Sequence, residues 1–148
     1  MGNNHISNFG ANGIKATQKY LDEADVDYFG APAGSKSIIE NINGIKISFV
    51  SYNQFANDQP PEIVNEIGKA KLEADLVFVF CHWGNEYELA QTTNQTSLAH
   101  QFIDAGADLV VGSHPHVIQP SEEYNGKKIY YSLVNFIFDQ YFSEDVRN

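Results

Sequence analysis

The chain is predicted to form an α/β domain with a mixed β-sheet. Short apolar runs typical of buried strands alternate with longer segments in which apolar residues recur every three or four positions, as in amphipathic helices. Two Asn-Gly dipeptides, at residues 43–44 and 125–126, indicate tight turns that join antiparallel strands. The length of 148 residues suits one domain, and residues 1–148 show no repeat or low-complexity tract that would divide it.

The first part of the chain is predicted to contain a helix, a short strand and a hairpin. Ile14 and Leu21 lie on one side of the expected helix, whereas Lys15 and Lys19 lie outside. Asn43-Gly44 is the strongest hairpin signal in the chain. The expected elements are a helix over residues 10–24, a strand over 26–29, and hairpin strands over 37–42 and 45–52.

Strands and helices are expected to alternate through the rest of the chain. Pro60 and Pro61 end a polar loop and mark the start of a helix, because proline fits the first helical turn. Gly106 is expected to cap the C-terminus of the next helix. The expected elements are a helix over 62–74, a strand over 76–81, a helix over 95–105, a strand over 109–112, and a second hairpin in which 117–119 pairs with 128–136.

The chain carries 19 acidic residues against 9 basic ones, a net charge of −10. This charge argues against nucleic acid as a partner and against docking on an anionic membrane. No run of about 18 apolar residues is present, so the chain is expected to be soluble as it stands. Cys81 is predicted to be a small buried residue, with a thiolate nucleophile as the alternative. His100, in the middle of a predicted helix, is expected to face solvent.

Histidines mark the ends of several predicted elements. His114 and His116 follow an apolar run, and residues two apart in an extended backbone point to the same face. Pro115 is expected to hold His114 in an extended conformation. His82 ends another apolar run, and His5 precedes the first helix. Because α/β proteins bind ligands at strand ends, these imidazoles predict a metal site; the alternative is that each is a structural or surface histidine.

Four motifs also carry a resemblance to a known family. They are Asn3-Asn4-His5, His82-Trp83-Gly84-Asn85-Glu86-Tyr87, Gly112-Ser113-His114-Pro115-His116-Val117, and residues 131–140. Together they look like the CapA family of capsule and poly-γ-glutamate biosynthesis proteins, which belongs to the calcineurin-like metallophosphoesterase superfamily. The resemblance covers essentially the whole chain, residues 1–148. It implies the C-terminal portion of the metallophosphatase fold, in which mixed sheets lie between helical layers.

The resemblance implies a metal site in which Asn4, His82 and His114 bind one ion and His116 binds a second. Imidazole nitrogens and an amide oxygen suit Mn, Zn or Fe better than magnesium or calcium, which prefer oxygen ligands. The complete domain would hold one or two such ions. The superfamily also has two earlier carboxylate-bearing segments that this chain does not contain, so the chain is expected to bind at most one ion.

Further residues are assigned roles by the same resemblance. His5 resembles the catalytic imidazole that protonates the leaving group; the alternative is a histidine at a frayed helix entry. Asn8 stands where the family usually has aspartate, and Val134 where it usually has glycine. Trp83 and Tyr87 are expected to wall the substrate pocket, with packing as the alternative. Glu86 and Asn135 are expected to contact the substrate. Asn135 and Asp139 are also expected to orient the His-x-His loop, with loop capping as the alternative.

The resemblance implies a component of capsule or poly-γ-glutamate biosynthesis or export. The alternative is a metal-dependent hydrolase of the phosphoesterase type, inactive as this chain alone. The expected partners are capsule-biosynthesis proteins or an anionic polymer, and no nucleic acid. The parent protein is expected to be membrane-anchored outside the cytoplasm of a bacterium. Since the chain supplies mainly the C-terminal half of the fold, an uncovered sheet flank is expected to allow a homodimer.

Overall fold

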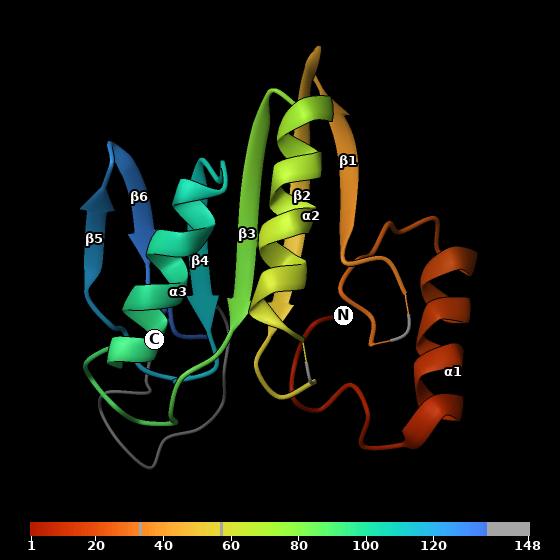
Figure 1. The fold of residues 1–148 in the computed structure, drawn as a ribbon. Coiled ribbons are helices and arrows are strands. Elements are labelled where there is room, and N and C mark those ends of the chain that lie inside the picture. Colours follow the sequence, from red (N-terminus) through yellow and green to blue (C-terminus); the bar gives the residue numbers. More distant parts are fainter. Residues whose placement is uncertain (33, 57, 136–148) are drawn as a thin grey trace.

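The computed structural model describes residues 1–32, 34–56 and 58–135, which form an α/β fold on one six-stranded sheet (Figure 1). The strand order is β1-β2-β3-β4-β6-β5. The four inner strands are parallel and the two edge strands are antiparallel to their neighbours, so the predicted mixed sheet is confirmed. The strands are β1 (Ser37–Ile42), β2 (Ile45–Asn53), β3 (Leu76–His82), β4 (Leu109–Ser113), β5 (Ser121–Tyr124) and β6 (Lys127–Tyr130).

Two helices connect the parallel strands and cover the same face of the sheet (Figure 1). Helix α2 (Pro60–Glu73) joins β2 to β3, and α3 (Thr93–Asp104) joins β3 to β4. Helix α1 (Gly10–Glu23) stands apart on the β1 side of the sheet and buries none of its residues. Of the helices described, none is both long and apolar enough to span a lipid bilayer.

The helix starts have local causes in the sequence. Proline occupies the first turn of α2, as predicted, where a missing N–H has no cost. The Thr92 side chain accepts a hydrogen bond from Gln95 N, and the Gln95 side chain accepts one from Thr92 N. This reciprocal capping box explains why α3 begins two residues before the predicted position 95.

The sheet has two different faces. On the helix-covered face, the side chains of Val50, Val79 and Val110 are fully buried. The opposite face carries Phe49 and Phe78, which are paired in register, and Phe80, which is 40% exposed. Phe49, Phe78 and Phe80 lie in aromatic contact along this face, which we call the open face. Within the described residues no helix covers it (Figure 1), in agreement with the expected uncovered flank.

Two predicted elements differ in the structure. Residues 26–29 do not form a strand; instead, the Phe29 ring packs against Phe49 and Phe80, so side-chain contacts and not ladder hydrogen bonds hold the segment. The second hairpin consists of β5 and β6, and residues 117–119 contribute only an isolated bridge between Ile118 and Leu133. Residue 136, the end of the predicted strand, lies outside the described residues.

Candidate metal centre

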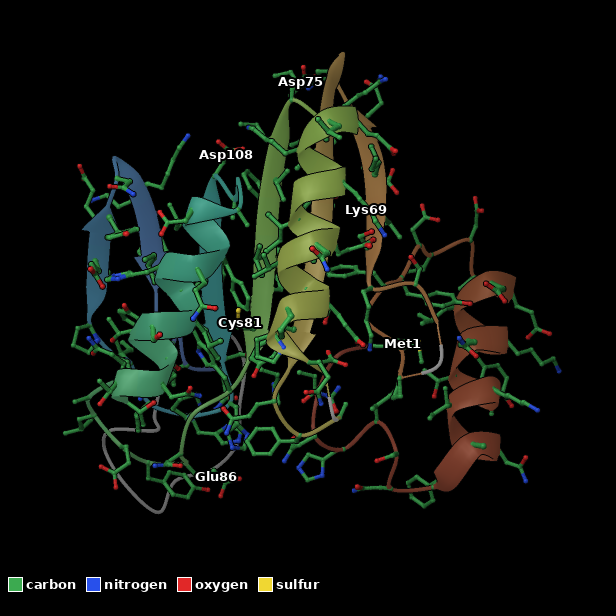
Figure 2. All side chains as sticks on the ribbon, in the orientation of Figure 1. Met1, Lys69, Asp75, Cys81, Glu86 and Asp108 are labelled. Atoms are coloured by element: carbon green, nitrogen blue, oxygen red, sulfur yellow. The ribbon has the colours of Figure 1, made fainter. Side chains whose placement is uncertain are left out.

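The candidate site lies at the carboxyl edge of the parallel strands. The last residues of β2, β3 and β4 are aligned across the sheet, with Asn53 opposite His82 and His82 opposite Ser113. The Asn53 amide nitrogen donates a hydrogen bond of 2.9 Å to the carbonyl oxygen of Asn3. This bond holds the N-terminal segment against the strand ends. Glu86 lies at this end of the sheet, whereas Asp75 and Asp108 lie at the other end (Figure 2).

His82 is held between Asn4 and Ser113. Its Nε2 lies 3.0 Å from Asn4 Oδ1, and its Nδ1 lies 3.2 Å from Ser113 Oγ. Because the amide oxygen accepts, the ring proton is on Nε2 and Nδ1 accepts from the Ser113 hydroxyl. Ligand atoms of one tetrahedral ion with bonds of about 2.1 Å lie about 3.4 Å apart, so a cation that replaced this proton would have Nε2 and Oδ1 as two of its ligands.

The His-Pro-His segment differs from the extended arm predicted from sequence. His114 has φ +97° and His116 has φ +59°, so both lie in the left-handed region and Pro115 does not keep His114 extended. Strand β4 ends at Ser113, and the chain turns there instead of continuing straight. The turn still gathers the imidazoles, because ring centroids lie 6.0 Å apart for His114–His116 and 4.9 Å apart for His82–His114. Such backbone conformations occur at functional sites, where surrounding contacts hold them.

Both central imidazoles are held in the neutral form that binds metals. Burial and, to a smaller extent, the neighbouring imidazoles, led by that of His114, together lower the pKa of His82 to about 4. Burial also lowers the pKa of His114, with Glu86 acting in the opposite direction. His114 is only 8% exposed, and its Nδ1 is buried with no hydrogen-bond partner among the described residues. A buried, unpartnered ring nitrogen is costly unless a ligand binds it, so the donor set fits a divalent transition metal.

His116 is oriented by Asn135. His116 Nδ1 lies 3.0 Å from Asn135 Oδ1, and because that oxygen is an acceptor, the ring proton is on Nδ1 and the lone pair is on Nε2. Metal-binding imidazoles commonly donate their second nitrogen to an oxygen in this way. Asn135 therefore has the orienting position expected from sequence, whereas Asp139 lies outside the described residues. Val134, just before it, has φ +63°, a conformation that favours glycine.

His5 is exposed, in a turn just before α1. Its Nδ1 lies 3.0 Å from the Asn8 amide nitrogen, which can only donate, so the ring proton of neutral His5 is on Nε2. His5 is close enough to lower the pKa of both His82 and His114. Its role as the catalytic imidazole stays a prediction.

Trp83 and Tyr87, both expected near the substrate, have different surroundings in the segment after β3. Trp83 is fully buried, and its Nε1 donates to the carbonyl oxygen of Tyr131 at 3.0 Å. It cannot contact a substrate in this position, so the packing alternative holds for Trp83. Tyr87 is 45% exposed and its ring lies 6.1 Å from that of His116. Glu86 is exposed and has a carboxylate oxygen within 4.8 Å of ligand nitrogens of His114 and His116.

Sequence reasoning missed residues that support the site from strand ends and loops. Asn53 was placed in a polar loop, although its position directly after an apolar run was a usable signal. Phe55 packs its ring 4.4 Å from that of His114, and nothing in the sequence pattern indicates this contact. Gln95 and Gln119 are buried and bonded to each other at 3.1 Å, behind the loop that carries Glu86.

Two expectations outside the site have clear outcomes. Cys81 is 1% exposed, and burial raises the pKa of its thiol, which fits a small core residue and not a nucleophile. His100 does not simply face solvent, as was predicted. Its Nε2 lies 2.8 Å from Glu122 and its ring stacks on Tyr124 with centroids 3.7 Å apart.

A mixed α/β sheet with imidazoles, an amide and a carboxylate at the carboxyl ends of its parallel strands is consistent with a phosphatase-like fold that has a candidate metal centre. The family model described as "Bacterial capsule synthesis protein PGA_cap" matches residues 1–140. The chain belongs to this family. The resemblance to CapA proteins that the sequence motifs carried is therefore confirmed.

Named relatives agree with the family. The chain is 40% identical to the capsule biosynthesis protein CapA of Bacillus anthracis, over 95% of the chain and 39% of that protein. It is 37% identical to the PGA biosynthesis protein CapA of Bacillus subtilis, over 93% of the chain and 41% of that protein. The chain thus spans about two fifths of the length of these relatives.

A solved structure is similar in fold. A hypothetical protein from Thermus thermophilus superposes with a TM-score of 0.52 and 23% sequence identity. The match covers 68% of this chain and 39% of that one. At this identity the likeness supports the fold alone.

Proposed function

We propose that this chain is the metal-binding portion of a CapA-type component of capsule or poly-γ-glutamate biosynthesis. The observation that carries the proposal is the meeting of His82, His114 and Asn4 at one sheet edge, where the buried Nδ1 of His114 has no hydrogen-bond partner among the described residues. The names of the relatives from the two Bacillus species support the biological role. The metal would be Mn, Zn or Fe, because imidazole ligands favour these ions.

A bound cation would also explain how this acidic chain binds an acidic polymer such as poly-γ-glutamate. The net charge of −10 repels a polyglutamate, whereas a divalent ion attracts its carboxylates. The 148-residue chain should therefore bind poly-γ-glutamate in Mn²⁺ and lose this binding in chelator. Equilibrium dialysis of labelled polymer measures it, with poly-α-glutamate of equal length as the matched control. Equal binding with and without metal, or no binding at all, would contradict a metal-mediated contact.

A metal-dependent hydrolase of the phosphoesterase type is the second candidate. It is favoured by His5, whose Nε2–H form can donate a hydrogen bond to a leaving group near His82 and His114. We expect the 148-residue chain to show negligible turnover of an aryl phosphate with Mn²⁺ or Zn²⁺. A turnover number near the enzyme median of about 10 s⁻¹ would favour the hydrolase instead.

The open face of the sheet supports a homodimer. Phe29, Phe49 and Phe80 line an apolar hollow of about 550 Å³ on this face. A second copy presenting the same aromatic residues would remove them from water. Sedimentation analysis should show a dimer that Phe80→Lys converts to a monomer, while Leu72→Lys, a change at an exposed apolar residue of α2, leaves it dimeric. A monomeric wild-type chain would contradict the dimer but not the metal centre.

The remaining parts of the proposal concern the parent protein. It would be anchored in a bacterial membrane, face the outside of the cytoplasm, and work with other capsule-biosynthesis proteins. Fractionation of cells that express the full-length parent tests this directly. Recovery in the cytosolic fraction would contradict it.

A further inference from the structure

We propose that Glu86 is a carboxylate ligand of the metal centre, together with His114 and His116. This inference rests on the proposed metal centre and adds a ligand from the loop after β3. One carboxylate oxygen of Glu86 and one ring nitrogen of each histidine all lie within 4.8 Å of one another. A small closure of this group brings the three atoms onto one ion, since ligands of one tetrahedral ion lie about 3.4 Å apart.

The two histidines of the group are prepared to bind. His114 is 8% exposed, and its Nδ1 is buried with no partner in the described ranges 1–32, 34–56 and 58–135. His116 donates Nδ1–H to Asn135, so its Nε2 carries the lone pair. Both conformations are fixed by left-handed backbone, with φ +97° and φ +59°. The group therefore offers two oriented nitrogens and needs an anionic third ligand to neutralise part of the charge of the ion.

The loop that carries Glu86 is anchored on both sides of it. Before Glu86, the backbone N–H of Gly84 donates to Gln54 Oε1 at 3.0 Å. Directly after Glu86, the backbone N–H of Tyr87 donates to the carbonyl oxygen of Pro115 at 2.8 Å, which ties the loop to the His-Pro-His turn.

Further along, the buried Gln119 side chain donates to the carbonyl oxygens of Glu88 and Ala90 at 2.9 and 3.1 Å. Gln119 is itself bonded to Gln95, so the support reaches into the core. Glu86 thus projects from a loop with a fixed backbone, which lowers the entropy that binding would otherwise cost.

Electrostatics agree with this placement. One carboxylate oxygen of Glu86 lies within 4.8 Å of ring nitrogens of both His114 and His116, so its negative charge is next to the place where a cation would bind. The other ligands in reach, His82 and Asn4, are neutral when they bind a metal. A carboxylate beside three imidazoles and an amide is a mixed shell typical of Mn, Fe and Zn sites.

The test compares Glu86→Gln with Glu88→Gln in the 148-residue chain. Both residues are exposed and lie on the same loop, but Glu88 is not in the cluster. Titration calorimetry with Mn²⁺ and Zn²⁺ should give an affinity about 10-fold or more weaker for Glu86→Gln, and an unchanged affinity for Glu88→Gln. The absorption spectrum of bound Co²⁺ should change only in Glu86→Gln, and both variants should melt like wild type in chelator.

The outcomes separate this inference from the proposed function. If wild type binds metal and Glu86→Gln binds it as tightly with the same Co²⁺ spectrum, the Glu86 assignment is wrong and the metal centre stands. If wild type binds no metal, the centre and the inference both fail. Glu86→Asp serves as a second variant, and it should keep part of the affinity because the carboxylate remains.

Discussion

His82 Nε2 and Asn4 Oδ1 lie 3.0 Å apart although the two residues are 78 positions apart in the chain. The contact joins the N-terminal turn to the end of β3, a central strand of the sheet. It exists because Asn53, the neighbour of His82 across the sheet, binds the backbone of Asn3. The site is therefore assembled from the start of the chain and from three strand ends, and it depends on the fold more than on any single motif.

Stability in chelator should fall as the pH falls from about 6.5 to about 4. Burial, together with the neighbouring imidazoles, lowers the pKa of His82 from its ordinary value of 6.5 to about 4, so in this window the unfolded chain binds more protons than the folded one. The stabilisation is fully present above 6.5 and is lost toward 4. Urea unfolding across this range measures it. The variant His82→Gln should show a flatter pH profile, and an equal slope in both proteins would contradict the buried, neutral state of His82.

Val134→Gly should stabilise the fold. Val134 has φ +63°, and a non-glycine residue in the left-handed region costs about 1–2 kcal/mol. The added chain entropy of glycine offsets about 0.5–1 kcal/mol of this, so the expected gain is about 0.5–1 kcal/mol in the free energy of unfolding. Val134→Ala is the control, because it keeps the backbone strain. A glycine variant no more stable than the alanine variant would show that Val134 is not strained.

The variant Asn8→Asp should switch the tautomer of neutral His5. The Asn8 amide nitrogen donates to His5 Nδ1, which places the ring proton on Nε2. A carboxylate can only accept at this position and so requires the proton on Nδ1. Nitrogen chemical shifts of ¹⁵N-labelled histidine report the tautomer. The same tautomer in wild type and variant would show that Asn8 does not orient His5.

Much of the fold was predictable because its signals are local. Strand β3 is a continuous apolar run, and Asn43-Gly44 adopts positive φ at both turn positions. Helix α2 begins at proline and α3 follows a capping threonine. The strand expected over residues 26–29 failed for a non-local reason. The Phe29 ring packs against Phe49 and Phe80 on the open face of the sheet. The local sequence does not indicate that these distant residues lie beside it.

The candidate site was predictable in its residues but not in its geometry. The element ends identified His82, His114 and His116, since sheets place such ends together. The left-handed turn at His114 is not predicted by the sequence rule for residues before proline, which favours an extended backbone. A neighbouring loop contacts this turn, since Tyr87 N–H donates to the carbonyl oxygen of Pro115, and such a contact has no local sequence signal. The sequence also could not separate the roles of Trp83 and Tyr87. Both are aromatic residues of one motif, but in the structure Trp83 is buried and Tyr87 is exposed.

The metal affinity of His114→Ala shows directly whether the imidazoles at the sheet edge bind a cation. His114 is buried beside His82 with Nδ1 unpartnered among the described residues, so its removal should weaken Mn²⁺ or Zn²⁺ binding by about 10-fold or more while changing the melting temperature in chelator little. His100→Ala is the control. It should leave metal affinity unchanged but lower the melting temperature, because it loses Glu122 and the stacked Tyr124.

Thermal melts and metal titrations of wild type, His114→Ala and His100→Ala therefore decide the assignment. We expect wild type and His100→Ala each to bind one ion and to melt higher with metal than in chelator, whereas His114→Ala should lack this gain. The contradicting result is a wild-type chain that gains nothing from metal, together with a His114→Ala chain that melts far below it in chelator. His114 would then be a structural histidine of the fold and not a metal ligand.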